Sequence, residues 1–134
     1  MTGSPRAAGY LMKRLLIFTA VVEGLTGLIL LAYPPVALRL LLGPEITSMS
    51  ILISRLTGIA LIALAVACWP DRNLFRAFSG MLTYNLLATL FLVYAGLIGA
   101  SGILLWPAVA LHAGLSIFLV QAWRRERRTP HTNF

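Results

Sequence analysis

Four polar side chains interrupt the long apolar stretches of this sequence, and these are the residues best placed to do chemistry. Each stretch contains one of them: Glu23, Arg55, Asn85 and His112. An ionisable group in lipid costs several kcal/mol unless it is paired or solvated, so such groups normally face the protein interior and meet one another. We therefore expect these four side chains to form one polar cluster.

The predicted cluster has a functional and a structural interpretation. In the functional one, a small cavity opens toward the outer face, Arg55 binds an anionic or polar head group, and Glu23 or His112 transfers a proton. In the structural one, hydrogen bonds and an ion pair only fix the register of the helices. Glu23 and Arg55 are predicted to form a direct or one-water ion pair, because both lie mid-span on consecutive antiparallel helices. The alternative for Arg55 is an interfacial anchor that extends to the head groups.

Apolar stretches of about twenty residues must position these groups. A helix rises about 1.5 Å per residue, so each stretch can cross a hydrocarbon core about 30 Å thick. Of the 134 residues, 59% are hydrophobic and 11% charged, against about 25% charged in soluble domains. The sequence predicts an all-α integral membrane four-helix bundle, a single transmembrane domain over residues 1–134. Its helices are expected at about 15–33, 50–69, 77–98 and 103–123, between polar tails at 1–14 and 124–134.

A short segment between the first two helices is predicted to lie in the membrane interface. Pro34 and Pro35 end the first helix because proline lacks the amide donor and restricts the preceding residue. The sequence VALRLLL that follows is too short to span but apolar over most of its circumference, which suits a short helix with Arg39 toward the head groups. Thr47 or Ser48 is expected to cap the second long helix.

Cations are distributed unequally between the two ends of the expected helices. One side has nine (Arg6, Lys13, Arg14, Arg72, Arg76, Arg124, Arg125, Arg127 and Arg128), and the other has Arg39 and Arg55. Because positive residues are retained on the cytoplasmic side, both termini are predicted to be cytoplasmic.

Small residues spaced four apart predict places where helix backbones approach closely. These pairs are Ala20 and Gly24, Ser54 and Gly58, Ala63 and Ala67, Ala95 and Gly99, and Ala110 and Gly114. Most are expected to serve packing within the monomer.

Several functional classes are argued against by the residue types. The net charge of +7 and pI near 10.8 would suggest nucleic acid in a soluble protein, but these cations flank apolar runs as membrane anchors do, so no nucleic-acid partner is expected. The single Cys68 excludes an intramolecular disulfide. No CxxC, HExxH or GxSxG motif is present, and the only other histidine, His131, lies in the tail, so neither a metal nor another cofactor is expected.

The layout of the chain resembles the DoxX-like small bacterial membrane proteins. The features that carry the resemblance are the length, four helices, cytoplasmic termini and the segment VALRLLLGPE before an arginine-containing helix. The resemblance implies a four-helix bundle and a link to redox or membrane-complex accessory roles. We therefore expect a non-enzymatic accessory subunit or homo-oligomer with a buried polar cluster, in a bacterial inner membrane. The alternative is binding or transport of a small polar, anionic or amphipathic ligand at an Arg55 and Glu23 cavity.

Overall fold

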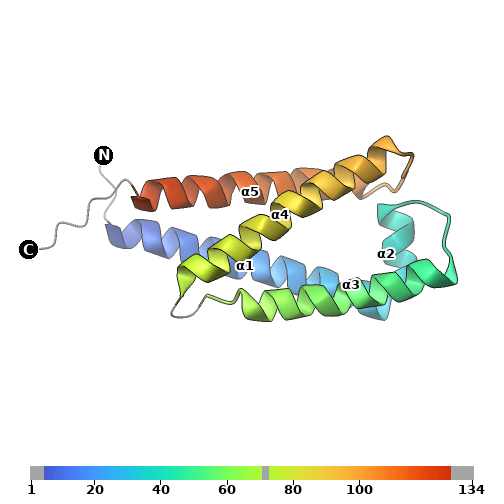
Figure 1. The fold of residues 1–134 in the computed structure, drawn as a ribbon, viewed down its shortest axis with the longest axis horizontal. Coiled ribbons are helices and arrows are strands. Elements are labelled where there is room, and N and C mark those ends of the chain that lie inside the picture. The colour runs from blue at the N-terminus through green and yellow to red at the C-terminus, as the bar shows by residue number, and fades with distance from the viewer. Residues whose placement is uncertain (1–4, 71–72, 128–134) are drawn as a thin grey trace, which may run out of the picture.

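The computed structural model describes residues 5–70 and 73–127, and in this part of the chain all regular structure is helical. The helices are α1 (Pro5–Ala32), α2 (Pro34–Leu41), α3 (Ser48–Ala67), α4 (Leu74–Leu97) and α5 (Leu105–Arg127) (Figure 1). All of them except α2 are long and apolar enough to cross a membrane. The prediction of an all-α chain with four candidate membrane spans is confirmed.

Helix α1 begins at Pro5, ten residues before the predicted start at 15. Proline is tolerated in the first turn of a helix, where its missing N–H has no intrahelical acceptor in any case. Gly9 alone costs about 1 kcal/mol relative to alanine, which is too little to end a helix that packs well. Met12 and Leu16 are 4% and 0% exposed. Their tertiary packing therefore stabilises the helix before the predicted start at residue 15.

Helix α5 continues to Arg127, past the predicted end at 123. Its last turns contain Trp123, whose ring stacks on Phe78 at 5.9 Å and lies 4.1 Å from the guanidinium carbon of Arg127. The rest of the predicted tail, residues 128–134, lies outside the described residues, as does Arg72 of the predicted polar turn.

The long helices associate as two close pairs, α1 with α3 and α4 with α5, and the pairs meet mainly where α1 contacts α5. Helices α3 and α4 have few contacts with each other although they are consecutive. The start of α1 and the end of α5 lie at the same end of the molecule (Figure 1). Helix α2 stands at the opposite end, across the direction of the long helices.

Glycines allow α1 and α3 to approach backbone to backbone. A Cβ atom on Gly58 would lie 2.5 Å from the Gly27 carbonyl oxygen, and one on Gly27 would lie 2.7 Å from the Gly58 carbonyl oxygen. At this crossing the Ser54 hydroxyl donates a hydrogen bond of 3.2 Å to the Leu30 carbonyl. The small pair Ser54 and Gly58 thus serves packing within the monomer.

Backbone hydrogen bonds tie α2 to the connection between α4 and α5. Ser101 N–H donates to the Leu42 carbonyl at 3.1 Å, and Leu104 N–H donates to the Leu40 carbonyl at 2.8 Å. Gly102 lies so close to the Leu41 backbone that a Cβ atom would collide with it. These bonds satisfy carbonyl groups at the end of α2 that have no partner within the helix.

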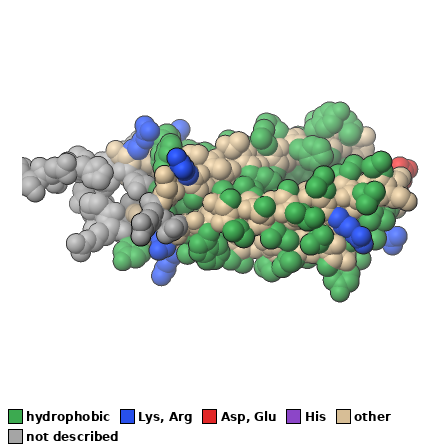
Figure 2. Space-filling view, turned by 60° about the horizontal axis from the view of Figure 1, so that its bottom comes forward, with side chains coloured by type: hydrophobic (Ala, Val, Ile, Leu, Met, Phe, Trp, Pro, Cys, Tyr) green, Lys and Arg blue, Asp and Glu red, His purple; other side chains and the backbone are tan. Residues whose placement is uncertain are grey.

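The lateral surface of the molecule is mainly apolar. Figure 2 shows hydrophobic side chains along the middle and Lys and Arg side chains toward the two ends. Large hydrophobic residues are exposed on every helix, including Phe18, Leu56, Leu90 and Phe118. A soluble protein rarely exposes so much continuous apolar surface, whereas lipid tails solvate it.

Candidate functional site

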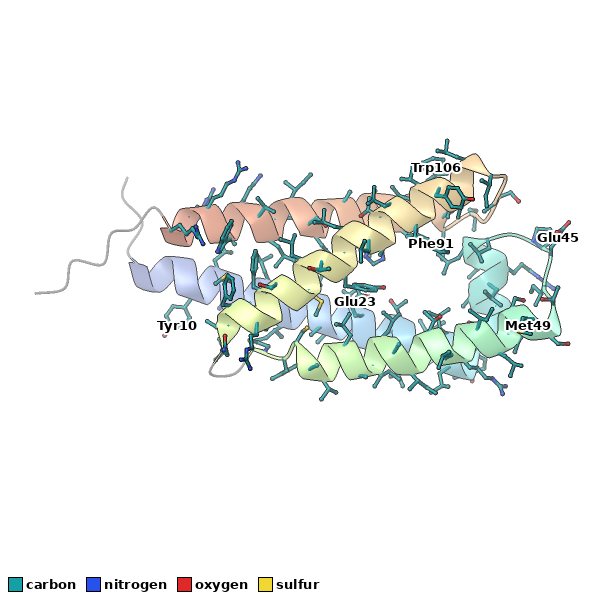
Figure 3. The ribbon with its side chains drawn as sticks, in the orientation of Figure 1. Tyr10, Glu23, Glu45, Met49, Phe91 and Trp106 are labelled. Carbon is teal, nitrogen blue, oxygen red and sulfur yellow. The ribbon has the colours of Figure 1, made fainter. Side chains whose placement is uncertain are left out.

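Three of the four predicted site residues meet inside the molecule, one from each of α1, α4 and α5. Glu23 and Asn85 have no exposed surface, and His112 is 9% exposed. Figure 3 shows Glu23 near the middle of the long axis, between Tyr10 at one end and Glu45 at the other. The three side chains are therefore far from both ends of the candidate membrane spans.

The sequence positions these side chains through the helical repeat. On α1, the buried residues Leu16, Thr19, Ala20, Glu23, Gly27 and Leu30 follow spacings of three and four and form one stripe. Asn85 continues a similar stripe on α4 from Phe78 and Met81, and His112 precedes Leu115 and Leu119 in one on α5. Each polar residue is thus turned inward by the apolar residues one helical turn away.

A chain of hydrogen bonds orients Asn85 and His112. The Asn85 side-chain amide donates to the Met81 carbonyl at 2.9 Å, which leaves Asn85 Oδ1 as an acceptor. His112 Nδ1 lies 2.9 Å from that oxygen. Since Oδ1 can only accept, the hydrogen resides on Nδ1, and in the neutral ring Nε2 carries the free lone pair.

Glu23 lacks hydrogen bonds despite its complete burial. Neither carboxyl oxygen has a hydrogen-bond partner among the described residues, and Oε1 lies 3.6 Å from His112 Nδ1. The Tyr84 hydroxyl lies next to this carboxyl without meeting hydrogen-bond geometry. The Tyr84 ring also packs edge-on against His112, with ring centroids 5.8 Å apart. Buried polar groups are nearly always hydrogen-bonded, so the two acceptor oxygens of Glu23 are exceptional.

Arg55 is not part of this cluster, and the predicted Glu23–Arg55 ion pair is wrong. Arg55 is exposed and makes no ion pair or hydrogen bond with the described residues. The buried stripe of α3 is formed by Ser54, Gly58, Leu61 and Ala65, and Arg55 is rotated by about 100° from Ser54. It lies about 10 Å along α3 from Ser48, and helical side chains lean toward the helix N-terminus. Arg55 thus points away from the cluster, and its role as an interfacial anchor stays a prediction.

Tyr84 is the member of the cluster that the sequence reasoning did not assign. It directly precedes Asn85, and its ring is partly buried. Its position in the middle of a candidate span, next to a predicted site residue, could have indicated that Tyr84 belongs to the cluster. A tyrosine hydroxyl that is buried away from water needs a hydrogen-bond partner.

The cluster has few ligands for a metal ion. Nowhere in residues 5–70 and 73–127 do three or more His, Cys, Asp or Glu side chains come together in a way that could hold one. What the arrangement offers is a carboxyl with two free acceptor oxygens, a tyrosine hydroxyl and an imidazole N–H.

No protein-family model, curated protein or solved structure matches this chain. The resemblance to DoxX-like proteins therefore stays a prediction. The geometry of the cluster is the observation that bears on function.

Proposed function

We propose that this chain is a multi-pass bacterial inner-membrane protein that binds a small polar ligand at the cluster of Glu23, Tyr84, Asn85 and His112. The observation that carries the proposal is the complete burial of Glu23 with two oxygens that accept no hydrogen bond. A charged or polar group at this depth is costly and marks a functional site by default. A ligand that donates hydrogen bonds to Glu23 would remove that cost.

The proposed topology places both termini in the cytoplasm and α2 in the outer interface of a four-helix bundle. Its support is that Lys13, Arg14, Arg76, Arg124 and Arg125 are exposed near one end of the long helices. The opposite end carries α2 with its exposed Arg39, which suits a short amphipathic helix at the head groups.

The charged side chains near the cluster determine which class of ligand it favours. Arg55 is directed outward, so no cation of the described residues is available to neutralise an anionic ligand. The acceptors at Glu23 instead favour a donor, either a small cation such as an alkylammonium or a neutral hydrogen-bond donor. This reverses the expectation of an anionic head group.

Thermal unfolding of the purified protein in lipid nanodiscs tests the proposal. Methylammonium chloride is expected to stabilise the wild type in a concentration-dependent manner, whereas sodium acetate and sodium phosphate are not. Glu23→Gln should abolish the response to methylammonium. The matched control is Glu45→Gln, because Glu45 is exposed at the end of the molecule (Figure 3). A response that survives in Glu23→Gln, or that follows the anions, contradicts the proposal.

A second candidate function is that of a homo-oligomer or accessory subunit, which the exposed small residues favour. Ala60, Ala63 and Ala67 are all exposed on one face of α3, where small side chains permit close approach of another helix. On α5, a Cβ atom on Gly114 would meet nothing within 4 Å, so that glycine has no packing role in the monomer. Native mass spectrometry from mild detergent is expected to show a dimer or a co-purifying partner, and a monomer alone would exclude this candidate.

A further inference from the structure

We infer that the same site also takes up a proton: Glu23 is reversibly protonated, and its ionisation transfers the Nδ1–H hydrogen bond of His112 from Asn85 Oδ1 to Glu23 Oε1. The inference rests on the proposed function and adds the proton to the cations that Glu23 is proposed to bind. It also assigns His112 a positioning role in the uptake and release of that proton.

The burial of the cluster favours the smallest ligand. Glu23 and Asn85 have no exposed surface, so a larger ligand requires the helices to separate before it can enter. The His112 side chain keeps 11% of its surface exposed, against 0% for Glu23. Of Glu23, Asn85 and His112, only His112 keeps exposed surface, and Tyr84 beside it is partly buried. A proton can pass between hydrogen-bonding side chains, so its exchange requires less opening of the cluster than the entry of a larger ligand.

The N–H group of His112 is a single hydrogen-bond donor that lies between two possible acceptors. His112 Nδ1 lies 2.9 Å from Asn85 Oδ1 and 3.6 Å from Glu23 Oε1. The observed geometry, in which the carboxyl accepts no hydrogen bond, suits a neutral Glu23 that keeps its own proton. A carboxylate would compete more strongly for the N–H, because hydrogen bonds to an ionised acceptor are about twice as strong as those between neutral groups.

The proton step exchanges one O–H bond, on the Glu23 carboxyl, for another on a water molecule. The O–H bond of the Glu23 carboxyl breaks, its electron pair stays on oxygen, and the proton leaves to a water molecule. The hydrogen on His112 Nδ1 remains bonded to nitrogen and changes only its acceptor. The charge of the cluster goes from zero to minus one.

Among the residues that the structure describes, the neighbouring helices present no fixed charge to Glu23. From α4 comes Tyr84 and from α5 comes His112, while α3 turns Ser54 inward and Arg55 outward. The Arg39 side chain of α2 is exposed at the end of the molecule. Stabilisation of the carboxylate thus depends on the His112 N–H and the Tyr84 hydroxyl, the two donors next to it.

The exchange of acceptors has a consequence for the helices. In the neutral state the hydrogen bond of His112 links α5 to α4, and in the ionised state it links α5 to α1. Protonation therefore changes which helix pair is tied together at the centre of the membrane. This is a bistable element of the kind that couples ligand binding to a conformational change.

An infrared pH titration in nanodiscs tests the inference. The wild type is expected to show the C=O stretch of one protonated carboxyl, which disappears as the pH is raised. The band should be absent from Glu23→Gln and retained in Glu45→Gln. A band that persists, or that is absent, throughout the pH range in which the protein stays folded overturns the inference. Methylammonium binding is measured separately, so its result stands whatever the titration shows.

Two further variants distinguish a proton switch from a structural cluster. Asn85→Leu removes the competing acceptor and should move the loss of the band to lower pH, whereas His112→Leu removes the donor and should move it to higher pH. Each shift should be about one pH unit, because a hydrogen bond of ordinary strength changes an equilibrium about tenfold. Shifts in the same direction, or no shift, would contradict the exchange of acceptors.

Carbodiimide labelling of the wild type covers the case in which a variant fails to fold. Carbodiimides react with protonated carboxyls in apolar surroundings, so Glu23 should be modified and the modification should decline with rising pH. Peptide mass spectrometry locates the adduct, with Glu45 as the internal control. Labelling of Glu23 that does not depend on pH, or none at all, overturns the inference.

Discussion

The contact between Gly27 and Gly58 permits a quantitative prediction about what holds α1 and α3 together. Gly58→Ala places a methyl group 2.5 Å from the Gly27 carbonyl oxygen and 2.9 Å from the Leu31 amide nitrogen. Both neighbours are backbone atoms, so no side-chain rotation relieves the overlap. Restoring an ordinary contact of 3.4 Å requires the helices to part by roughly 0.9 Å.

Three effects set the size of the change. Overpacking costs about 1–3 kcal/mol, and the parting also stretches the 3.2 Å hydrogen bond from Ser54 to Leu30, worth about 1 kcal/mol. Alanine regains about 1 kcal/mol of helix propensity relative to glycine. Gly58→Ala should therefore destabilise the protein by about 1–3 kcal/mol.

Gly114→Ala is the matched control, since it is the same substitution within a long helix. A Cβ atom there meets nothing within 4 Å, so only the gain in helix propensity of up to about 1 kcal/mol remains. Reversible unfolding in mixed micelles, followed by circular dichroism, measures both variants. If Gly58→Ala proved as stable as the wild type, or if Gly114→Ala lost as much stability, the close backbone contact would not govern this interface.

Two further predictions concern the charged residues. In a double-mutant cycle of Glu23→Leu and Arg55→Leu, the losses of unfolding free energy should be additive within about 0.5 kcal/mol, because the side chains do not contact each other. A coupling energy well above that value, measured by thermal unfolding, would show that the two residues do form an ion pair. In a Cys68→Ser background, a cysteine at Glu45 should react with an impermeant maleimide applied to intact cells, and one at Thr129 should react only after permeabilisation. External labelling at Thr129 would reverse the proposed topology.

Much of the architecture is predictable from the sequence because it depends on local properties. The length and hydropathy of each apolar run determine that it can span a membrane, whichever neighbours it meets. Pro34 and Gly43 delimit the short helix α2, and Thr47 caps α3 through reciprocal hydrogen bonds with Ser50. The start of α1 was predicted too late, because the packing of Met12 outweighs the weak helix preference of the segment around it.

The direction in which each polar side chain points was decided by tertiary structure. The depth of a residue along a helix follows from counting residues. By this count, Glu23 and Arg55 lie at depths in the membrane that are similar enough for their side chains to pair. Rotation about the helix axis depends on which neighbour packs against which face. Because the glycines bring α1 and α3 together through the Ser54 and Gly58 face, Arg55 is directed outward and Glu23 meets His112 instead, 89 residues away along the chain. No property of an isolated helix determines such a contact, since it arises only when three helices pack around one carboxyl.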